Sequence, residues 1–534
     1  MISGRFWAVV AILLGVMAAL QFFTARQESQ TFDESNQLLS GYTYLTTGHF
    51  TVSPEHPPLL KLLWAVPVAL LRPSPAPTDG TLQAGREFLY HNRVPADTML
   101  MAGRCSAIAI AVLLGVAMAF WARRHFGERV ALFSVFLYAC DPNFLANGRY
   151  MKNDVGAALM VFSAAILWGE YLIEPTRKRL LLSGVVLGLA LTTKFSALAL
   201  GPVMLLLYAV HRWLGRRAFG IGECVRSLVA AGAIASLVIL AVYRFDIGPL
   251  NGSGLPIPAP AFFRGLGEIG MRQTERGLWI GYLLGAISHT GWWYMSPVAF
   301  LAKTPLSELA LFALAIGLVA VRLKRLRLHD IGFRWFLLAV PAACYFGVSL
   351  LAHFNAGERH LLPVYPFLFI LSAAVVLAPP VPKWRWAAAA LTALILMAEA
   401  AGVHPHYLAF FNAVAGGPVG GRHVLVDSNL DWGQDVKHLK SYLEAHHIPE
   451  VCIAYFGMAD LAYYGIRSRA LPAVPDEEAA RQLDCVAAIS VTWMSVEGAG
   501  AAYAGLDEME PDARIGYSIY VYDLRRQAKP ALLQ

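Results

Sequence analysis

The sequence predicts an all-α membrane domain with many transmembrane helices, followed by a small α/β domain outside the membrane. Of the 534 residues, 57% are hydrophobic and 15% are charged, and the mean hydropathy is +0.51. This chain is too apolar for a soluble protein of its length. The second domain is predicted because apolar runs of helical length give way to short strand-like runs after about residue 405.

Eleven apolar segments approach the length of about 20 residues that a helix needs to cross the hydrocarbon core of a bilayer. The first follows one basic residue, Arg5, and no small-residue cleavage site follows it, so we expect a retained helix rather than a removed signal peptide. The two segments around Thr193 and Lys194 are also compatible with one kinked span. The segments lie near residues 6–23, 98–121, 130–147, 155–172, 180–192, 196–211, 227–243, 297–321, 333–351, 361–378 and 386–403.

Basic residues are grouped in the short connections between these segments, and with eleven helices every group falls on one side. An excess of Lys and Arg marks cytoplasmic loops, so we expect a multi-pass protein of the inner (plasma) membrane with a cytoplasmic N-terminus and an extracytoplasmic C-terminal domain. The same grouping excludes a nucleic-acid-binding surface as the meaning of the net charge of +7. The groups are Arg123, Arg124, Arg129; Arg177, Lys178, Arg179; Arg212, Arg216, Arg217, Arg226; Arg322, Lys324, Arg325, Arg327; and Lys383, Arg385.

The first outer loop, residues 24–97, carries two pairs of polar residues at the membrane interface. Asp33 and Glu34 follow the first predicted helix, and Glu55 and His56 begin an amphipathic helix at a Pro-Pro pair. Two interpretations stay open for both pairs. The pairs are either solvated helix ends, where Asp satisfies free backbone amides, or parts of one site.

Further charges lie on the same outer side, where ionisable groups near membrane depth are costly unless they pair or line a cavity. Asp154 is either an N-cap or a site carboxylate, and each cation alone fits a snorkelling side chain. Cations and carboxylates recurring on one face favour a shared site, because carboxylates can deprotonate a hydroxyl and cations can hold a phosphate. The residues are Arg149, Asp154, Lys194, Lys303, Arg359 and His360.

Together these motifs resemble those of the GT-C membrane glycosyltransferases, and especially the protein O-mannosyltransferases and the lipid A aminoarabinose transferases. The motifs are the Asp-Glu pair, Glu-His-Pro-Pro-Leu, Arg-x4-Asp, the Thr-Lys turn and Arg-His-Leu-Leu-Pro-Val-Tyr-Pro, within residues 1–405. The resemblance implies a GT-C transmembrane domain and a polyprenyl-phosphate-linked sugar donor. It also implies inverting transfer to a hydroxyl of a lipid, glycan or protein acceptor at the outer face.

The resemblance also implies residue roles. The catalytic residue of the first outer loop maps to Asp33. The other site carboxylates implied are Glu34, Glu55 and Asp154, and the candidates for the donor phosphate are Lys194, Lys303, Arg359, His360 and Arg149. His360 stands where a Tyr is common. Some members hold a divalent metal cation, for which Glu55, His56 and His289 are candidate ligands, and the cofactor is left open.

Residues 406–534 are predicted to form the extracytoplasmic α/β domain. Within the segment 426–435, Asp431 and Trp432 belong either to a turn capped by Asp and Asn or to a contact with sugar or acceptor. Cys452 and Cys485 could form a disulfide if this domain lies in an oxidising compartment, but their position in strand-like apolar runs weighs against it. The strand-like runs are His423–Val426, Val451–Phe456, Cys485–Val491 and Tyr517–Tyr522, and a helical run is Gln434–Leu443.

The function predicted is therefore that of an inverting glycosyltransferase. A multi-pass transporter or lipid flippase of the cell envelope is the alternative, and a structural module of an envelope assembly is a third class. A transporter is expected to carry ionisable residues near the middle of its helices and a repeat between its halves. In this sequence the charges gather at one face and no repeat stands out.

Overall fold

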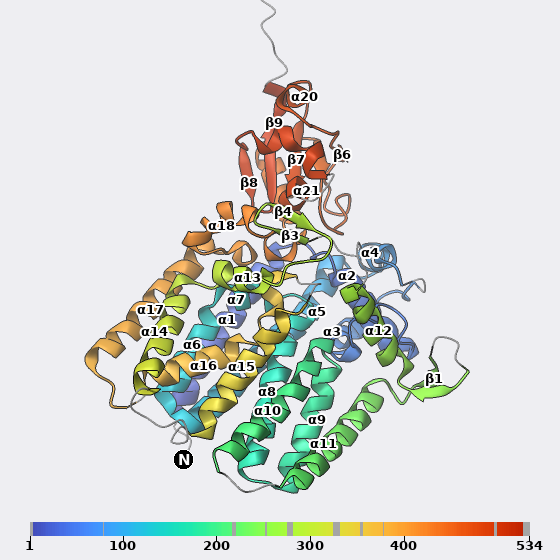
Figure 1. The fold of residues 1–534 in the computed structure, drawn as a ribbon. Helices are drawn as coiled ribbons and strands as arrows, with labels where there is room; N and C mark the ends of the chain where they lie inside the picture. Colours follow the sequence, from blue (N-terminus) through green and yellow to red (C-terminus); the bar gives the residue numbers. More distant parts are fainter. Residues whose placement is uncertain are drawn as a thin grey trace, which may run out of the picture.

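A layer of long helices carries a smaller body of strands on one of its ends, opposite the N-terminus (Figure 1). The structure is a computed structural model that describes residues 4–77, 80–215, 220–250, 254–274, 281–323, 332–352, 356–377, 379–495 and 499–526. The helices of the layer are α1 (Gly4–Gln27), α5 (Ala96–Phe126), α6 (Glu128–Cys140), α8 (Asn153–Ile173), α9 (Arg177–Leu191), α10 (Leu200–Trp213), α11 (Ile221–Val242), α13 (Met295–Lys303), α14 (Leu306–Leu323), α15 (Phe333–Ser349), α16 (Tyr365–Val376) and α17 (Lys383–Val403).

Every predicted membrane segment contains a helix of this layer. Within the described ranges, six helical segments are long and apolar enough to cross a membrane, namely α1, α5, α8, η1 (Phe195–Ala199) with α10, α11 and α17. The helices α6, α9, α15 and α16 have 13, 15, 17 and 12 residues, less than a full span. The chain is a membrane protein, and the count of eleven spans stays a prediction.

The predicted span 297–321 is wrong as a single helix. Helices α13 and α14 meet at a bend of 111°. Thr304 between them has an extended backbone, with φ −74° and ψ 131°, because a residue before proline avoids the helical region and Pro305 has no N–H to continue the helix. The bend leaves Lys303 in contact with the C-terminal segment.

Short elements cover the end of the layer that carries the C-terminal strands. They are α2 (Glu34–Thr47), α3 (Pro58–Leu70), α4 (Leu82–Tyr90), α7 (Pro142–Asn147), α12 (Pro260–Thr274) and the hairpins β1 (Ile247–Pro249) with β2 (Pro256–Pro258) and β3 (Gly281–Leu283) with β4 (Ala286–Ser288). Helix α3 begins at Pro58, as expected from the Pro-Pro pair. Helices α2 and α3 pack closely at Gly41, where a Cβ would lie 2.1 Å from the carbonyl oxygen of Lys61.

The C-terminal segment contains a five-stranded sheet in the order β6-β5-β7-β9-β8. Strand β5 pairs in parallel with β6 and β7, and β9 pairs antiparallel with β7 and β8. The strands are β5 (Val451–Ala454), β6 (Ser468–Ala470), β7 (Val486–Ser490), β8 (Ala513–Ile515) and β9 (Ile519–Asp523), and α19 (Val436–Ala445) precedes them. The strand-like runs 451–456, 485–491 and 517–522 therefore contain strands β5, β7 and β9.

The strand expected over His423–Val426 is wrong. Leu425 donates its backbone N–H to the carbonyl of Gly421, and the carbonyl of Val424 accepts from Leu284 of the β3–β4 hairpin. This short run is thus a turn against the hairpin, with Leu425 and Val426 buried and His423 exposed. Its side chains pack in one hydrophobic cluster with residues of α13 and of the sheet.

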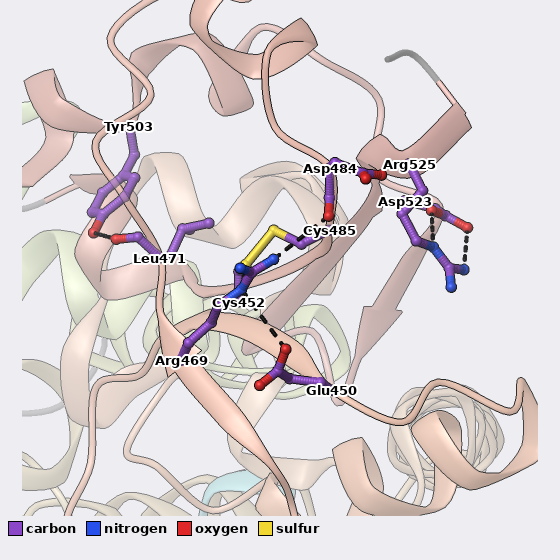
Figure 2. The surroundings of a disulfide bond; sticks show 9 residues. All are labelled: Glu450, Cys452, Arg469, Leu471, Asp484, Cys485, Tyr503, Asp523 and Arg525. Carbon is purple, nitrogen blue, oxygen red and sulfur yellow. Dashed lines mark hydrogen bonds and ion pairs between the residues drawn. A yellow bond between two sulfur atoms is a disulfide. The ribbon is translucent and has the colours of Figure 1, made fainter. Parts of the chain in front are cut away.

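Cys452 in β5 and Cys485 just before β7 form a disulfide between neighbouring strands (Figure 2). Arg469 of β6 lies beside it, donating to Cys452 Sγ at 3.1 Å and pairing with Glu450 at 3.9 Å. The two cysteines are thus paired, although their position in strand-like apolar runs had weighed against a disulfide.

Some of the basic residues used for the predicted orientation lie outside the described residues. They are Arg216, Arg217, Lys324, Arg325 and Arg327.

Candidate active site

The loop between α1 and α2 is anchored by a buried ion pair between Glu28 and Arg149. Nε of Arg149 lies 2.9 Å from Glu28 Oε2 and Nη2 lies 2.6 Å from Oε1. The remaining amino group, Nη1, donates to the carbonyl of Leu145 at 2.7 Å. Burial opposes the charge of Arg149, but the Glu28 carboxylate raises the pKa of Arg149 above its ordinary value. Because its donors are occupied within the protein, Arg149 is a positioning residue in this geometry.

A second buried pair holds the other end of the same loop. Arg104 of α5 binds Glu34 with two hydrogen bonds, Nε to Oε1 at 3.0 Å and Nη2 to Oε2 at 2.6 Å. Glu34 also accepts from the backbone N–H groups of Thr31 at 2.8 Å and Met151 at 3.1 Å. Burial alone would raise the pKa of Glu34, but Arg104 and these donors hold it below its ordinary value. With both oxygens occupied, Glu34 is suited to holding the loop and not to accepting a proton from a ligand.

Asp33 lies between these two anchors and remains accessible. Its side chain is 30% exposed, whereas that of Glu34 is fully buried. Asp33 occupies the N-cap position of α2, but its side chain makes no capping hydrogen bond. Its carboxylate instead forms an ion pair with Lys152. Burial raises the pKa of Asp33, but Lys152 and then Arg359 outweigh burial and lower it below the ordinary value.

A second accessible ion pair joins α8 to the turn before η1. Lys194 Nζ lies 2.5 Å from Asp154 Oδ1. The preceding residue, Asn153, donates its side-chain amide to the carbonyl of Thr193 at 2.6 Å, which holds the same two segments together. Asp154 is therefore an ion-pair carboxylate at the start of α8.

Trp432 supports two cations of the site. Lys152 Nζ lies 4.9 Å and Arg359 Cζ 4.6 Å from the centre of its ring, distances at which a cation is attracted to an aromatic face. Nε of Arg359 is buried and has no hydrogen-bond partner in the part of the chain that the structure describes. Arg359 also interacts electrostatically with Asp33 and Asp154.

Two histidines lie among these cations. Burial lowers the pKa of His56 well below its ordinary value, and Lys152, Lys61 and Lys194 add to the effect. The pKa of His360 is lowered well below its ordinary value for the same reasons. Both imidazoles are therefore neutral at pH 7.

The structure thus gathers two carboxylates and three cations from separate segments of the chain. These are Asp33, Asp154, Lys152, Lys194 and Arg359, with His56 and His360 beside them. Such an arrangement can accept a proton at Asp33 while an anionic group is held by ammonium and guanidinium donors.

Other residues proposed from the sequence lie differently. Lys303 is buried and donates to the carbonyls of Leu408 at 2.9 Å and Asn429 at 2.7 Å. Asp431 is fully buried, and its carboxylate accepts from the backbone N–H of Thr492 at 3.1 Å. Burial raises the pKa of Asp431 to about 7. Contacts of this kind suit residues that join the C-terminal segment to the membrane layer.

The candidate metal ligands Glu55, His56 and His289 do not form a convergent group. His289 is exposed beyond the β3–β4 hairpin, whereas His56 lies among the cations of the site. Over the described ranges, the group of His, Cys, Asp or Glu side chains that brings three ligand atoms within 4.8 Å is His406, Asp435 and His438. The geometry therefore gives no support to the metal ligands expected from the sequence.

Sequence reasoning missed Glu28, Arg104 and Lys152. A lone arginine in the apolar segment 98–121 was a usable signal, because a charge at that depth requires a partner. Lys152 lies in the charge-dense turn 141–154, only two residues before Asp154. Glu28 gave no comparable signal, since its partner is 121 residues away.

Comparisons with known proteins bear on the family and the fold. Residues 97–243 match the family model described as dolichyl-phosphate-mannose-protein mannosyltransferase. ArnT from Cupriavidus metallidurans bound to undecaprenyl phosphate superposes with a TM-score of 0.51 at 13% identity, covering 99% of this chain and 100% of ArnT. Its apo state gives 0.50 at 14% identity, covering 98% and 99%.

The Pmt1-Pmt2 protein O-mannosyltransferase complex of S. cerevisiae, bound to the sugar donor, gives a TM-score of 0.34 at 22% identity. It covers 46% of this chain and 33% of the yeast chain. No protein in the curated set of sequences matches the chain. The likeness to ArnT shows a shared fold, and the resemblance to GT-C glycosyltransferases predicted from the motifs is confirmed.

Proposed function

We propose that this protein is an inverting glycosyltransferase that moves a sugar from a polyprenyl-phosphate donor to an acceptor hydroxyl at the outer face of the membrane. The observation that carries the proposal is the position of Asp33. It is an accessible carboxylate held between two buried ion pairs and beside cations, one of which, Arg359, keeps a buried Nε without a hydrogen-bond partner among the described residues.

The cations suit a lipid phosphate. Arg359 keeps its buried Nε without a partner among the described residues, and Lys152 and Lys194 are ammonium groups bound to one carboxylate each. An incoming phosphate would find all three close to Asp33. ArnT, whose fold this chain shares, was solved with undecaprenyl phosphate, and the matching family model is named for a dolichyl-phosphate sugar, which supports a donor of this class.

The proposed reaction is a single displacement at the anomeric carbon. The acceptor oxygen forms a bond to this carbon as its proton passes to Asp33, and the bond from the carbon to the phosphate oxygen breaks. The leaving lipid phosphate keeps the electron pair and is stabilised by Lys152, Lys194 and Arg359. A phosphate leaves as a stable anion, so no general acid is needed. Attack opposite the leaving group inverts the anomeric configuration.

Binding of the donor would also release Asp33, the proposed base, from its ion pair with Lys152. Before it binds, Lys152 neutralises Asp33. A phosphate competes for the same ammonium, and when Lys152 turns to the phosphate the pKa of Asp33 rises towards that of a usable base. Lys152 would therefore serve both as a phosphate contact and as a regulator of Asp33.

We assign residues 1–405 to the catalytic membrane domain and residues 406–534 to an outer domain that completes the site through Trp432. The inner (plasma) membrane, with the N-terminus in the cytoplasm, is the proposed location. Two observations support it: the Lys/Arg bias of the short loops, and the disulfide of the C-terminal segment, since disulfides persist in oxidising compartments.

The test is transfer of label from radiolabelled polyprenyl-phosphate sugars to membrane lipids, glycans and proteins, comparing the wild type with Asp33→Asn. General-base catalysis contributes about 10²–10⁴-fold to rate, so we expect transfer to fall by at least about 100-fold. Glu87→Gln is the matched control, because Glu87 is an exposed carboxylate on α4 of the same outer loop.

The control should transfer label at the wild-type rate, and all three proteins should show the same thermal midpoint in detergent. Equal labelling by wild type and Asp33→Asn would remove Asp33 as the base. Absence of transfer with every donor, combined with movement of labelled lipid across the membrane, would favour the lipid flippase.

A further inference from the structure

Three side chains with metal-ligating atoms converge where the last membrane helix meets the C-terminal segment. Nδ1 of His438 lies 2.8 Å, and Nδ1 of His406 3.8 Å, from Oδ1 of Asp435. The two imidazole rings meet edge to face with their centres 5.0 Å apart. The His side chains are each 23% exposed and Asp435 is 1% exposed, so the cluster opens to solvent on the histidine side.

These distances suit a single bound ion. Zn²⁺ binds His nitrogen and Asp oxygen at about 2.0–2.2 Å, which separates neighbouring ligand atoms of a tetrahedron by about 3.3–3.5 Å. The separations of 2.8 Å and 3.8 Å lie on either side of this value. Small rotations of the two partly exposed imidazoles would therefore complete the coordination without moving the backbone.

The Asp435 carboxylate is held in the orientation that a metal ligand needs. Its other oxygen, Oδ2, accepts from Ser518 Oγ at 2.6 Å and from Gln434 Nε2 at 2.8 Å. Gly516, at φ +59°, packs against it so closely that a Cβ would lie 2.3 Å from Asp435 Cγ. These contacts leave Oδ1 directed at the histidines. Metal ligands are commonly fixed in this way by hydrogen bonds from surrounding residues.

The cluster joins segments that are distant in sequence. His406 follows α17, Asp435 and His438 begin α19, and Ser518 lies in the turn between β8 and β9. The backbone beside Asp435 also contacts the loop between α1 and α2, since Ser29 donates its N–H to the carbonyl of Gln434 at 2.9 Å. An ion bound here would fasten the C-terminal segment to the membrane layer.

We propose that His406, Asp435 and His438 bind one divalent transition-metal ion of the Zn²⁺ class, with water in the open fourth position. The two imidazoles bind through Nδ1 as neutral rings, so the proton now shared between His438 and Asp435 is displaced when the ion enters. The site is separate from the proposed donor site, and the inference does not depend on the protein's activity.

The test uses full-length protein purified in detergent without a polyhistidine tag, stripped with EDTA and titrated with Zn²⁺ against a chromophoric chelator. We expect one ion per chain. His406→Ala and His438→Ala should each weaken binding by at least about tenfold, as loss of even a supporting contact commonly does. The matched control is His446→Ala, an exposed histidine at the C-cap of α19, and it should bind Zn²⁺ like the wild type.

Thermal unfolding separates loss of the site from loss of folding. In EDTA the wild type, His406→Ala and His446→Ala should unfold at the same temperature. Adding Zn²⁺ should raise the midpoint of the wild type and His446→Ala and leave His406→Ala unchanged. Absence of stoichiometric binding by the wild type, or wild-type affinity in both His406→Ala and His438→Ala, would overturn the proposal.

Discussion

Two kinds of ion pair lie close together at the end of the helical layer that carries the C-terminal strands. In the locked pairs, Glu28–Arg149 and Glu34–Arg104, no side chain is more than 2% exposed. In the open pairs, Asp33–Lys152 and Asp154–Lys194, one side chain of each is 15–30% exposed. Of the two adjacent carboxylates, Asp33 belongs to an open pair and Glu34 to a locked pair. Their equal charge in the sequence therefore conceals opposite roles.

The chemistry of the cation explains the difference. A guanidinium binds both oxygens of a carboxylate at once and keeps further donors for backbone carbonyls, as Arg104 does with Ala25 at 2.7 Å and Ser29 at 2.7 Å. An ammonium is a point charge, and Lys194 binds one oxygen of Asp154. The locked pairs therefore fix the loop that carries Asp33, and the open pairs leave carboxylates and cations that a substrate can engage.

The largest effect is expected from breaking a locked pair. Arg104→Met leaves Glu34 buried and uncompensated, which costs about 3–5 kcal/mol of unfolding free energy. Arg123→Met is the control on the same helix, because the Arg123–Glu128 pair is partly exposed and such pairs contribute at most about 1 kcal/mol. Thermal or denaturant unfolding in detergent measures both. Equal stability of the two variants would contradict the locked role.

Breaking an open pair should instead reduce activity and spare stability. Lys194→Met removes one cation from the proposed phosphate site, and a hydrogen bond to a charged group is worth about 1.5–3 kcal/mol. We expect kcat/KM for label transfer to fall about 10–100-fold. Lys440→Met, which removes a surface pair with Glu444, should leave transfer unchanged. Loss of stability in Lys194→Met comparable to that in Arg104→Met would erase the distinction between the two kinds of pair.

The pH dependence sharpens the comparison for Asp33. Burial alone would raise the pKa of Asp33, and Lys152 is the strongest of the charges that lower it. A general base acts only when unprotonated, so the acid limb of kcat/KM in the wild type should lie below the ordinary Asp pKa of about 3.9. Lys152→Met removes the lowering charge and keeps the burial, so its acid limb should move to higher pH by about one unit or more. An unchanged limb would show that Lys152 does not control Asp33.

The sequence named several residues that the structure brings together, but it did not divide them between locked and open pairs, and their roles stay a prediction. The motifs located Asp33, Asp154, Lys194 and Arg359, because charges next to apolar spans are conspicuous. Arg149 was assigned to the donor phosphate, since its partner Glu28 is 121 residues distant and only folding brings the two together. Side-chain burial, which separates Asp33 from Glu34, depends on the packing of α5 and the turn 141–154 over the loop.

The fold was predictable to a similar extent. Helical segments follow from apolar length alone, and all eleven contain helices. The bend between α13 and α14 was missed although Thr304-Pro305 signals it. The run 423–426 has the composition of a strand but becomes a turn, because the β3–β4 hairpin, more than 130 residues earlier in the chain, provides the partner for its backbone.

The smallest effect is expected from Arg359→Lys, which keeps the positive charge beside Asp33. The planar guanidinium stacks on Trp432 and presents a fork of donors that matches a phosphate, and an ammonium does neither as well. Cation–π attraction at a partly exposed site is worth about 0.5–1 kcal/mol, so we expect KM for the donor to rise about two- to fivefold with little change in kcat. Trp432→Phe should act in the same direction, since it weakens the same support for Arg359.

Arg525→Lys, at an exposed pair with Asp523 in the C-terminal segment, is the control for an arginine-to-lysine change and should leave KM unaltered. A fall in kcat with unchanged KM in Arg359→Lys would show that the leaving phosphate needs the guanidinium fork itself and not only its positive charge.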